Sequence, residues 1–397
     1  MTILLRTSTL IRPGAASTAV TAVAAAFPAH ARFSQMRFTH DIIKREKTGK
    51  VSVSLGPGGR SSSSAQTATV FGATGFLGRY VVNNLGKNGT TVITPYRGSD
   101  DERRHLRVMG DLGQIVQLRF DLRVDDQIAE CLRHSDVVYN LIGRDYETKN
   151  FNFEQVHVEG ARKLARIAKE NNVPKFIHVS ALNASEDSPS EFLRTKALGE
   201  KAVLEEFPDA TIIRPSTMYG DEDRFWNNMG EFAKWAPGSI IPVFQHGRAR
   251  IRPVYVGDVA AVLFKMTQDD SAVGKYVELY GPREYHYRAL VDMFQSIVLR
   301  ERNVLNVPKP LAKLIVNVWG RLMVCPVISP DDIERQCISD KITENSSDVL
   351  NFKDFGILPH TIEETVSRFV LNYRPGELYN APFEPIKNRY TTSHIRM

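Results

Sequence analysis

The sequence predicts an α/β fold, namely a Rossmann-type doubly wound parallel sheet with a smaller irregular C-terminal lobe. Two observations predict this fold class: short apolar runs alternate with helical segments, and the first run leads directly into a glycine-rich turn. The apolar runs are typical of strands that are buried on both faces. They are Thr67–Phe71, Thr91–Pro95, Ile115–Phe120, Val137–Ile142, Lys175–Ser180 and Thr211–Arg214.

The segment Phe153–Glu170 is the clearest of the expected helices. One stripe of its surface is apolar, as expected for a helix that packs against a sheet. The stripe consists of Phe153, Val156, Gly160, Leu164 and Ile167. After about Ser239 the strand–helix alternation loosens and proline and glycine become more frequent. We therefore expect a Rossmann dinucleotide-binding domain over 67–238 and a C-terminal lobe with a partner-binding tail over 239–397.

The first forty residues carry most of the net charge of +6, because they hold four arginines and no acid. They are also rich in Ala, Ser and Thr, a composition typical of a mitochondrial transit peptide. A merely disordered basic tail is the alternative. We expect the transit peptide over 1–38 and a flexible linker over 39–66, since Leu55–Ala65 is rich in glycine and serine. The remaining chain is close to neutral, which disfavours nucleic acid as a partner.

The overall composition excludes several classes of protein. Of the 397 residues, 42% are hydrophobic and 24% are charged, which is ordinary for a globular chain. No apolar run reaches about 18 residues, so we expect no membrane-spanning helix. The three cysteines, Cys131, Cys325 and Cys337, are too widely spaced for a zinc site or a disulfide framework. We expect no metal.

The glycine-rich turn is the strongest functional signal. Gly72, Gly75 and Gly78 follow the first strand with the spacing of a dinucleotide-binding turn, and an apolar helix begins there. Gly72 permits the tight turn, Gly75 lets backbone N–H groups approach a pyrophosphate, and Gly78 allows close packing of helix on strand. The helix N-terminus adds free amides and a positive dipole. We expect these glycines to hold a dinucleotide together with Thr74, Phe76 and Leu77.

The second strand predicts which dinucleotide is bound. An acid at its end would bind the ribose of NADH, whereas an arginine suits the 2′-phosphate of NADPH. Arg97 stands at that position, so we expect NADPH. NADH and FAD remain alternatives, because Asp100 and Asp101 are close by and the glycine turn alone does not exclude FAD. Asp121, after the third strand, and Leu141–Gly143 (Leu141, Ile142 and Gly143), after the fourth, are expected beside the adenosine.

At these residues the chain resembles the short-chain dehydrogenase/reductase superfamily, in its extended and atypical branch. The resemblance covers roughly Thr67–Gly281 and includes His178–Ala181, Phe192–Glu200, Arg214–Gly220 and Arg252–Ala260. In active members a Tyr-x-x-x-Lys motif supplies the acid/base and the lysine that orients it. The resemblance places Lys196 at the lysine, Ser180 at the substrate-binding serine and Phe192 at the tyrosine. It also assigns Pro215 and Ser216 to the cofactor site.

Phenylalanine has no exchangeable proton, so the resemblance implies a cofactor site without a catalytic residue. With the expected transit peptide, this pattern resembles the non-catalytic nucleotide-binding accessory subunits of mitochondrial NADH:ubiquinone oxidoreductase (complex I). That resemblance implies binding to other complex I subunits of the matrix arm and membrane junction, on the matrix side of the inner membrane, rather than a free homo-oligomer. The alternative is an active mitochondrial NADP-dependent reductase or epimerase that uses Tyr146 or Tyr219 as its acid.

The segment Lys309–Cys325 predicts an amphipathic helix, with its apolar residues on one stripe and basic residues opposite. The apolar residues are Leu311, Leu314, Ile315, Val318, Trp319, Leu322 and Met323. Such a helix suits inner-membrane lipid or a partner subunit, and ordinary packing in the core is the alternative.

Overall fold

The computed structural model describes residues 42–45, 51–54, 63–235, 240–300, 302–322, 329–343 and 349–381. The expected transit peptide, much of the expected linker and the end of the tail lie outside these residues. Within the linker range, strands β1 (Ile42–Arg45) and β2 (Val51–Ser54) pair antiparallel. The boundaries of the domains stay a prediction.

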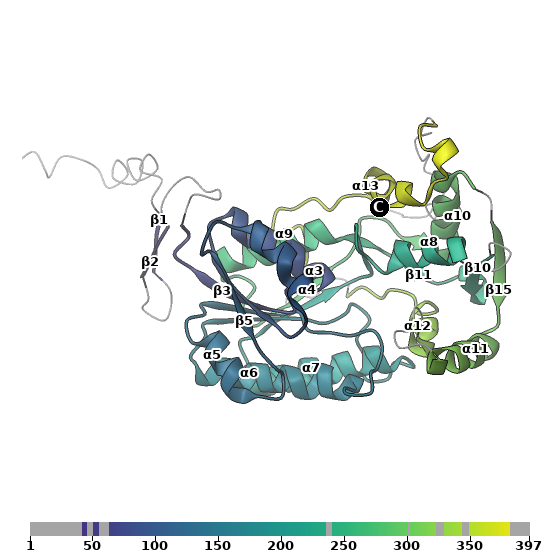
Figure 1. Ribbon diagram of the computed structural model, residues 1–397. Coiled ribbons are helices and arrows are strands. Elements are labelled where there is room, and N and C mark those ends of the chain that lie inside the picture. Colours follow the sequence, from purple (N-terminus) through teal and green to yellow (C-terminus); the bar gives the residue numbers. More distant parts are fainter. Residues whose placement is uncertain are drawn as a thin grey trace, which may run out of the picture.

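A sheet of eight strands forms the centre of the molecule (Figure 1). Every neighbouring pair in it is parallel, in the order β16-β13-β8-β7-β6-β3-β4-β5. The strands are β3 (Thr67–Phe71), β4 (Thr91–Tyr96), β5 (Ile115–Arg119), β6 (Val137–Asn140), β7 (Lys175–Val179), β8 (Thr211–Pro215), β13 (Tyr276–Leu279) and β16 (Val349–Leu350). Strands β4 and β5 are added on one side of β3, and β6, β7 and β8 on the other. The point where this order switches, between β3 and β6, is where ligands bind in doubly wound folds. The predicted fold class is confirmed.

Helices cover both faces of this sheet (Figure 1). On one face lie α3 (Phe76–Lys87) and α9 (Val256–Gln268), whose buried residues share one apolar core with the sheet. On the other face lie α5 (Asp125–Leu132), α6 (Gly160–Glu170) and α7 (Glu191–Glu206). Short helices follow β4, namely α4 (Asp100–Arg104) and the 3-10 helix His105–Met109.

The helix predicted over Phe153–Glu170 forms, but its first part is not regular. Residues Gln155–Glu159 make a π turn that precedes α6, and such turns are frequent at functional sites. Helix α7 crosses this turn closely, since a Cβ on Gly199 would collide with the carbonyl oxygen of His157. The close crossing places His157 beside the residues that form the cleft described below.

The second lobe lies beside the carboxyl ends of the central strands (Figure 1). Trp226 and Phe294 stack at its core, with ring centroids 6.4 Å apart. Its helices are α8 (Phe225–Trp235), α10 (Tyr287–Val298), α11 (Lys309–Leu322), α12 (Pro330–Arg335), α13 (Ile362–Val370) and the 3-10 turns Gln245–Gly247, Leu371–Tyr373 and Gly376–Leu378. Its strand pairs are β9 (Met218–Tyr219) with β12 (Val254–Tyr255), β10 (Ile240–Phe244) with β15 (Asn303–Val307), and β11 (Arg250–Ile251) with β14 (Tyr285–His286).

The range 239–397 does not belong to this lobe alone, because β13, β16 and α9 join the central sheet. In the part of the chain that the structure describes, no helix has the length and the apolar character needed to cross a membrane.

Candidate functional site

A cleft of about 530 Å³ opens at the carboxyl ends of β3, β6, β7 and β8. It contains most of the residues that the sequence predicts for the cofactor. These are Gly72, Gly75, Phe76, Leu77, Gly78, Leu141, Gly143, Ser180, Lys196, Pro215 and Ser216. Thr74, Arg97, Asp121 and Ile142 do not line this cleft.

The glycine turn leaves no room for side chains. Gly72 has a φ of +83°, and a Cβ there would lie 3.0 Å from the carbonyl carbon of Leu141. A Cβ on Gly75 would lie 3.2 Å from the carbonyl oxygen of Gly72. Gly75 is also the N-cap of α3, so no side chain caps the amides of the first turn. The cradle therefore fits the pyrophosphate of a dinucleotide, whose oxygens accept hydrogen bonds from such amides.

Lys196 and Ser180 form the floor of the cleft and are both buried. The Nζ of Lys196 donates to the carbonyl oxygen of Val179 at 3.0 Å. Burial lowers the pKa of Lys196 to about 8, although the charges of Asp145 and Glu200 act in the opposite direction. The Oγ of Ser180 is buried without a hydrogen-bond partner in the structure. A ribose or nicotinamide group offers the polar atoms that such an orphaned hydroxyl requires.

Two buried histidines stand behind this floor. The Nδ1 of His157 is 3.0 Å from the Oγ1 of Thr195, and the Nδ1 of His178 is 3.1 Å from the Nδ2 of Asn140. Burial, reinforced by the charge of Lys196, lowers the pKa of His157 to about 2 and that of His178 to about 3. The lowered pKa values favour the neutral form of both rings, and neither histidine lines the cleft.

Phe192 lies in the first turn of α7, at the position that the resemblance gives to the catalytic tyrosine. Its ring contacts the edge of His157, with centroids 5.2 Å apart, and lies 5.9 Å from the Nζ of Lys196. The guanidinium carbon of Arg335 lies 4.4 Å from the centroid of the same ring. The place next to Lys196 thus holds an aromatic ring covered by a cation, and no hydroxyl.

The two tyrosines considered as substitutes lie elsewhere. Tyr219 is fully buried in the second lobe, where its hydroxyl is 2.9 Å from the Oγ1 of Thr365 and burial raises its pKa. Tyr146 lies beneath the guanidinium groups of Arg144 and Arg224, at 5.3 and 5.4 Å. Neither tyrosine lines the cleft, so the geometry offers neither as its acid.

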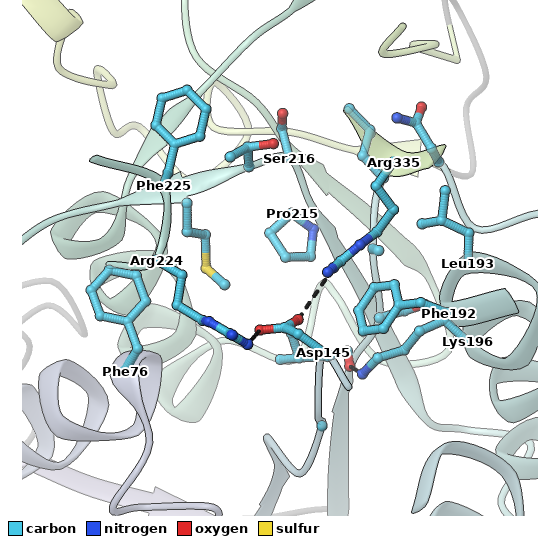
Figure 2. A pocket seen from close by; sticks show the side chains of 18 of the residues that line it. Phe76, Asp145, Phe192, Leu193, Lys196, Pro215, Ser216, Arg224, Phe225 and Arg335 are labelled. Carbon is cyan, nitrogen blue, oxygen red and sulfur yellow. Dashed lines mark hydrogen bonds and ion pairs between the residues drawn. The ribbon is translucent and has the colours of Figure 1, made fainter. Parts of the chain in front are cut away.

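An ion-pair network that the sequence did not predict fills the other half of the cleft. Asp145 accepts hydrogen bonds from the Nη1 atoms of Arg224 at 2.9 Å and Arg335 at 3.2 Å (Figure 2). Burial raises the pKa of Asp145, but the charges of Arg335 and Arg224 outweigh it and hold this pKa below its usual range. No motif marks these residues, because Asp145 and Arg335 are 190 positions apart.

The remaining predicted residues lie near the ends of β4, β5 and β6. The guanidinium carbon of Arg97 lies 5.2 Å from the ring centroid of Phe151, and that of Arg123 lies 4.4 Å from the same centroid. Asp121 accepts a hydrogen bond from the N–H of Arg123 at 2.9 Å. The structure thus adds Arg123, which the sequence did not single out, to the neighbourhood of Arg97. Its signal is its place in the turn after β5, two residues beyond Asp121.

Thr74 and Ile142 also lie outside the cleft. Thr74 belongs to the glycine turn, and its carbonyl oxygen accepts a hydrogen bond from the Nε of Arg79 at 3.4 Å. The N–H of Ile142 donates to the Oδ1 of Asn140 at 3.2 Å, and its side chain packs on the core of the α5–α7 face.

Comparison with known proteins shows the family to which the chain belongs. Residues 68–280 match the NAD dependent epimerase/dehydratase family. A Neurospora crassa protein named NADH-ubiquinone oxidoreductase 40 kDa subunit, mitochondrial, is 42% identical over 343 residues, which are 86% of this chain and 88% of that protein. The chain belongs to the NAD dependent epimerase/dehydratase family. It also belongs to the family of this NADH-ubiquinone oxidoreductase subunit, which we call the subunit family.

A second member of the subunit family comes from Arabidopsis thaliana. It is named NADH dehydrogenase [ubiquinone] 1 alpha subcomplex subunit 9, mitochondrial, and is 42% identical over 81% of either chain. Among solved structures, the NADPH-dependent quinone oxidoreductase QOR2 of Escherichia coli, complexed with NADPH, superposes with a TM-score of 0.59. It is 17% identical and covers 76% of this chain and 99% of its own. This likeness shows the shared fold.

Proposed function

We propose that this chain is an accessory subunit of mitochondrial complex I that binds NADPH for structural reasons and catalyses no reaction with it. Membership of the subunit family supports the place in complex I, because the similarity spans most of both chains. The expected transit peptide supports import into mitochondria. We place the chain on the matrix side of the inner membrane, with the other subunits of the matrix arm and the membrane junction as its partners.

The observation that carries the proposal is the contrast between the two halves of the cleft. The glycine cradle, Ser180 and Lys196 are all present and fit a dinucleotide. Bound NADPH could supply a hydride, but reduction of a carbonyl also requires a proton at the developing oxyanion. Phe192 has no proton to give, and Arg335 covers its ring. The residues of this chain therefore bind and orient the nucleotide without completing a reaction.

Arg97 and Arg123 support NADPH over NADH. Two guanidinium groups gather on the ring of Phe151, at the ends of β4 and β5. Two cations at one aromatic ring favour an anion near them, and the 2′-phosphate distinguishes NADPH from NADH. Phe151 holds both groups at this end of the sheet through cation–π contacts.

Helix α11 supports contact with inner-membrane lipid. Leu311, Leu314 and Ile315 have exposed fractions of 50%, 62% and 53%, whereas Ala312 faces the core and is buried. Ordinary core packing therefore does not explain these three residues of the predicted stripe. Exposed apolar side chains that lie together on one helix face are typical of helices in a membrane interface. The side chains of the stripe from Val318 onward lie outside what the structure describes.

The test is native electrophoresis of mitochondria that carry the tagged chain, followed by mass spectrometry of the nucleotide released on denaturation. We expect the chain in a complex of complex I size, with NADPH or NADP⁺ released in proportion to it. A free chain would contradict the role as a subunit, and NAD or no nucleotide would contradict the cofactor. Turnover of a carbonyl substrate by the purified chain would restore the enzyme alternative.

A further inference from the structure

Residues 329–343, which we call the strap, form part of the wall of the cleft. The strap contains α12 and comes from the C-terminal part of the chain, yet it contributes five residues to the lining. The lining residues from the strap are Asp332, Arg335, Gln336, Ile338 and Asp340. Most of the groups that it contacts belong to loops or helix ends that follow a central strand, on the side of the sheet where a dinucleotide binds.

The first anchor joins the strap to α7. Asp331 accepts hydrogen bonds from the Oγ of Ser190 at 2.7 Å and from the N–H groups of Glu191 at 2.8 Å and Phe192 at 3.3 Å. A carboxylate at a helix N-terminus interacts favourably with the helix dipole and its free amides. Here the carboxylate comes from about 140 positions away and holds the start of the helix that carries Phe192 and Lys196.

The second anchor joins the strap to the loop after β6. Arg335 donates to Asp145 and lies over the ring of Phe192 (Figure 2). The Oγ of Ser329 donates to the carbonyl oxygen of Asp145 at 3.3 Å. Asp145 follows Gly143, which lies so close to Lys196 that a Cβ on it would be 3.2 Å from the Nζ. The strap therefore bridges the two segments that flank the nicotinamide half of the cleft.

The third anchor is Asp340, which joins the loops after β7 and β8. Its carboxylate accepts hydrogen bonds from the Nδ2 of Asn183 at 2.8 Å, the Oγ of Ser216 at 2.6 Å and the N–H of Arg252 at 2.8 Å. Ser216 lines the cleft and is one of the residues expected at the cofactor. With this anchor, the strap is fixed to the loops after three adjacent central strands, β6, β7 and β8.

We propose that the strap closes the cleft over the bound nucleotide, so that NADPH leaves only after the contacts of Asp331, Arg335 and Asp340 break. The proposal rests on the nucleotide binding proposed above. A closed strap retains the nucleotide and restricts access of a second substrate to it, because Arg335 lies over the ring of Phe192 and is held there by Asp145. Release of the nucleotide and opening of the strap are then one event.

Two measurements on the full chain test this proposal. Hydrogen exchange of the nucleotide-free chain reports opening of residues 329–343, and a chase of bound NADPH with excess NADP⁺, followed by NADPH fluorescence, reports release. We expect Arg335→Ala to accelerate both exchange of the strap and release of NADPH at least tenfold. Asp331→Asn keeps the size of the side chain and is expected to act in the same direction, which guards against a folding defect of the first variant.

The matched control is Arg166→Ala. Arg166 has carboxylate partners too, Asp125 at 2.8 Å and Glu170 at 3.8 Å, but lies on α6 away from the cleft. Both rates should stay unchanged in this variant. Release of NADPH at the wild-type rate from Arg335→Ala and Asp331→Asn would overturn the proposal, even if exchange were faster. A wild-type chain that binds no NADPH would contradict the proposed function instead, while the exchange rates would still show whether the strap is closed.

Discussion

At the scale of single residues, burial sets the direction of the pKa shift of Lys196, whereas neighbouring charges set that of Asp145. Lys196 is buried, and its Nζ donates to a neutral carbonyl group in β7. Burial lowers the pKa of Lys196 to about 8. This value is close enough to physiological pH that a fraction of the amine is neutral. A lysine in this state remains a hydrogen-bond donor to ribose hydroxyls and carries less of the desolvation cost of a buried cation.

The lowered pKa of Lys196 predicts how stability depends on pH. Between pH 8 and about 10.5, the unfolded chain still holds this proton and the folded chain has lost it. The group therefore makes the free energy of unfolding rise with pH in this window, by up to about 1.4 kcal/mol per pH unit. Lys196→Met removes the effect. Urea unfolding of the nucleotide-free chain measures this free energy from pH 7 to 10. The free energy of unfolding of the wild type should rise relative to that of the variant. A difference between the two that does not change with pH would contradict the lowered pKa.

Arg97 and Arg123 differ in how well sequence predicts them. The position of Arg97 at the end of the second strand predicts its role, because the strand and the glycine turn fix that place relative to the ribose. Arg123 follows a later strand, and only the fold brings it to Phe151. Ser180 and Lys196 were predictable through the resemblance, whereas Asp145, Arg224 and Arg335 were not, since their contacts join distant parts of the chain.

We expect Arg97→Ala and Arg123→Ala each to weaken binding of NADPH by about 1.5–3 kcal/mol, the range for hydrogen bonds to charged groups. Binding of NADH should change little, because it has no 2′-phosphate, and it serves as the internal control. Calorimetry with both nucleotides measures the difference. Equal losses for NADPH and NADH in one variant would show that this arginine does not contact the phosphate.

At the scale of elements, the central strands were predictable because their signal is local. Each of the six apolar runs forms a strand of the parallel sheet. The prediction that all six are buried on both faces is wrong for β5, which lies at the edge of the sheet and has no buried residue. The strap has no comparable signal. Its residues are mostly polar and are typical of an ordinary helix cap and loop. Their role depends on hydrogen bonds to residues 120–190 positions away, which the sequence does not reveal. The spacing of apolar residues predicts which face of a helix or strand is apolar, but not which segment of the chain packs against that face.

Helix α11 is an element whose apolar face was predictable but whose contact was not. Its periodicity predicted an apolar stripe, and the structure leaves Leu311, Leu314 and Ile315 of this stripe exposed. Burying one leucine or isoleucine contributes about 1.5–3 kcal/mol when complete. The double variant Leu314→Glu and Ile315→Glu should therefore lower binding to vesicles of phosphatidylcholine and cardiolipin at least tenfold in a flotation assay.

Leu358→Glu is the control for this experiment, because Leu358 is 89% exposed but lies outside α11. Its vesicle binding should equal that of the wild type. If all variants bind vesicles equally well, or if the wild type does not bind them, the exposed stripe contacts a protein partner rather than lipid.

At the scale of the whole molecule, the proposed nucleotide site lies where the central sheet meets the second lobe and the strap. The cleft draws on the glycine turn after β3, the loops after β6, β7 and β8, and the second lobe. A ligand that binds only the folded chain stabilises it by RT ln(1 + [L]/Kd), about 2.7 kcal/mol at a hundredfold excess over Kd. This is a large share of a typical stability of about 5–15 kcal/mol.

A nucleotide with this structural role predicts a specific loss of assembly. Gly75→Asp adds a side chain that would meet the carbonyl oxygen of Gly72 and sets a carboxylate against the pyrophosphate. We expect the variant to bind no NADPH, to melt several degrees lower than the loaded wild type and to leave complex I unassembled in cells without the endogenous protein. Gly376→Asp is the control, because a Cβ there meets nothing within 4 Å. Full assembly around nucleotide-free Gly75→Asp would show that the site does not serve the structure of the complex.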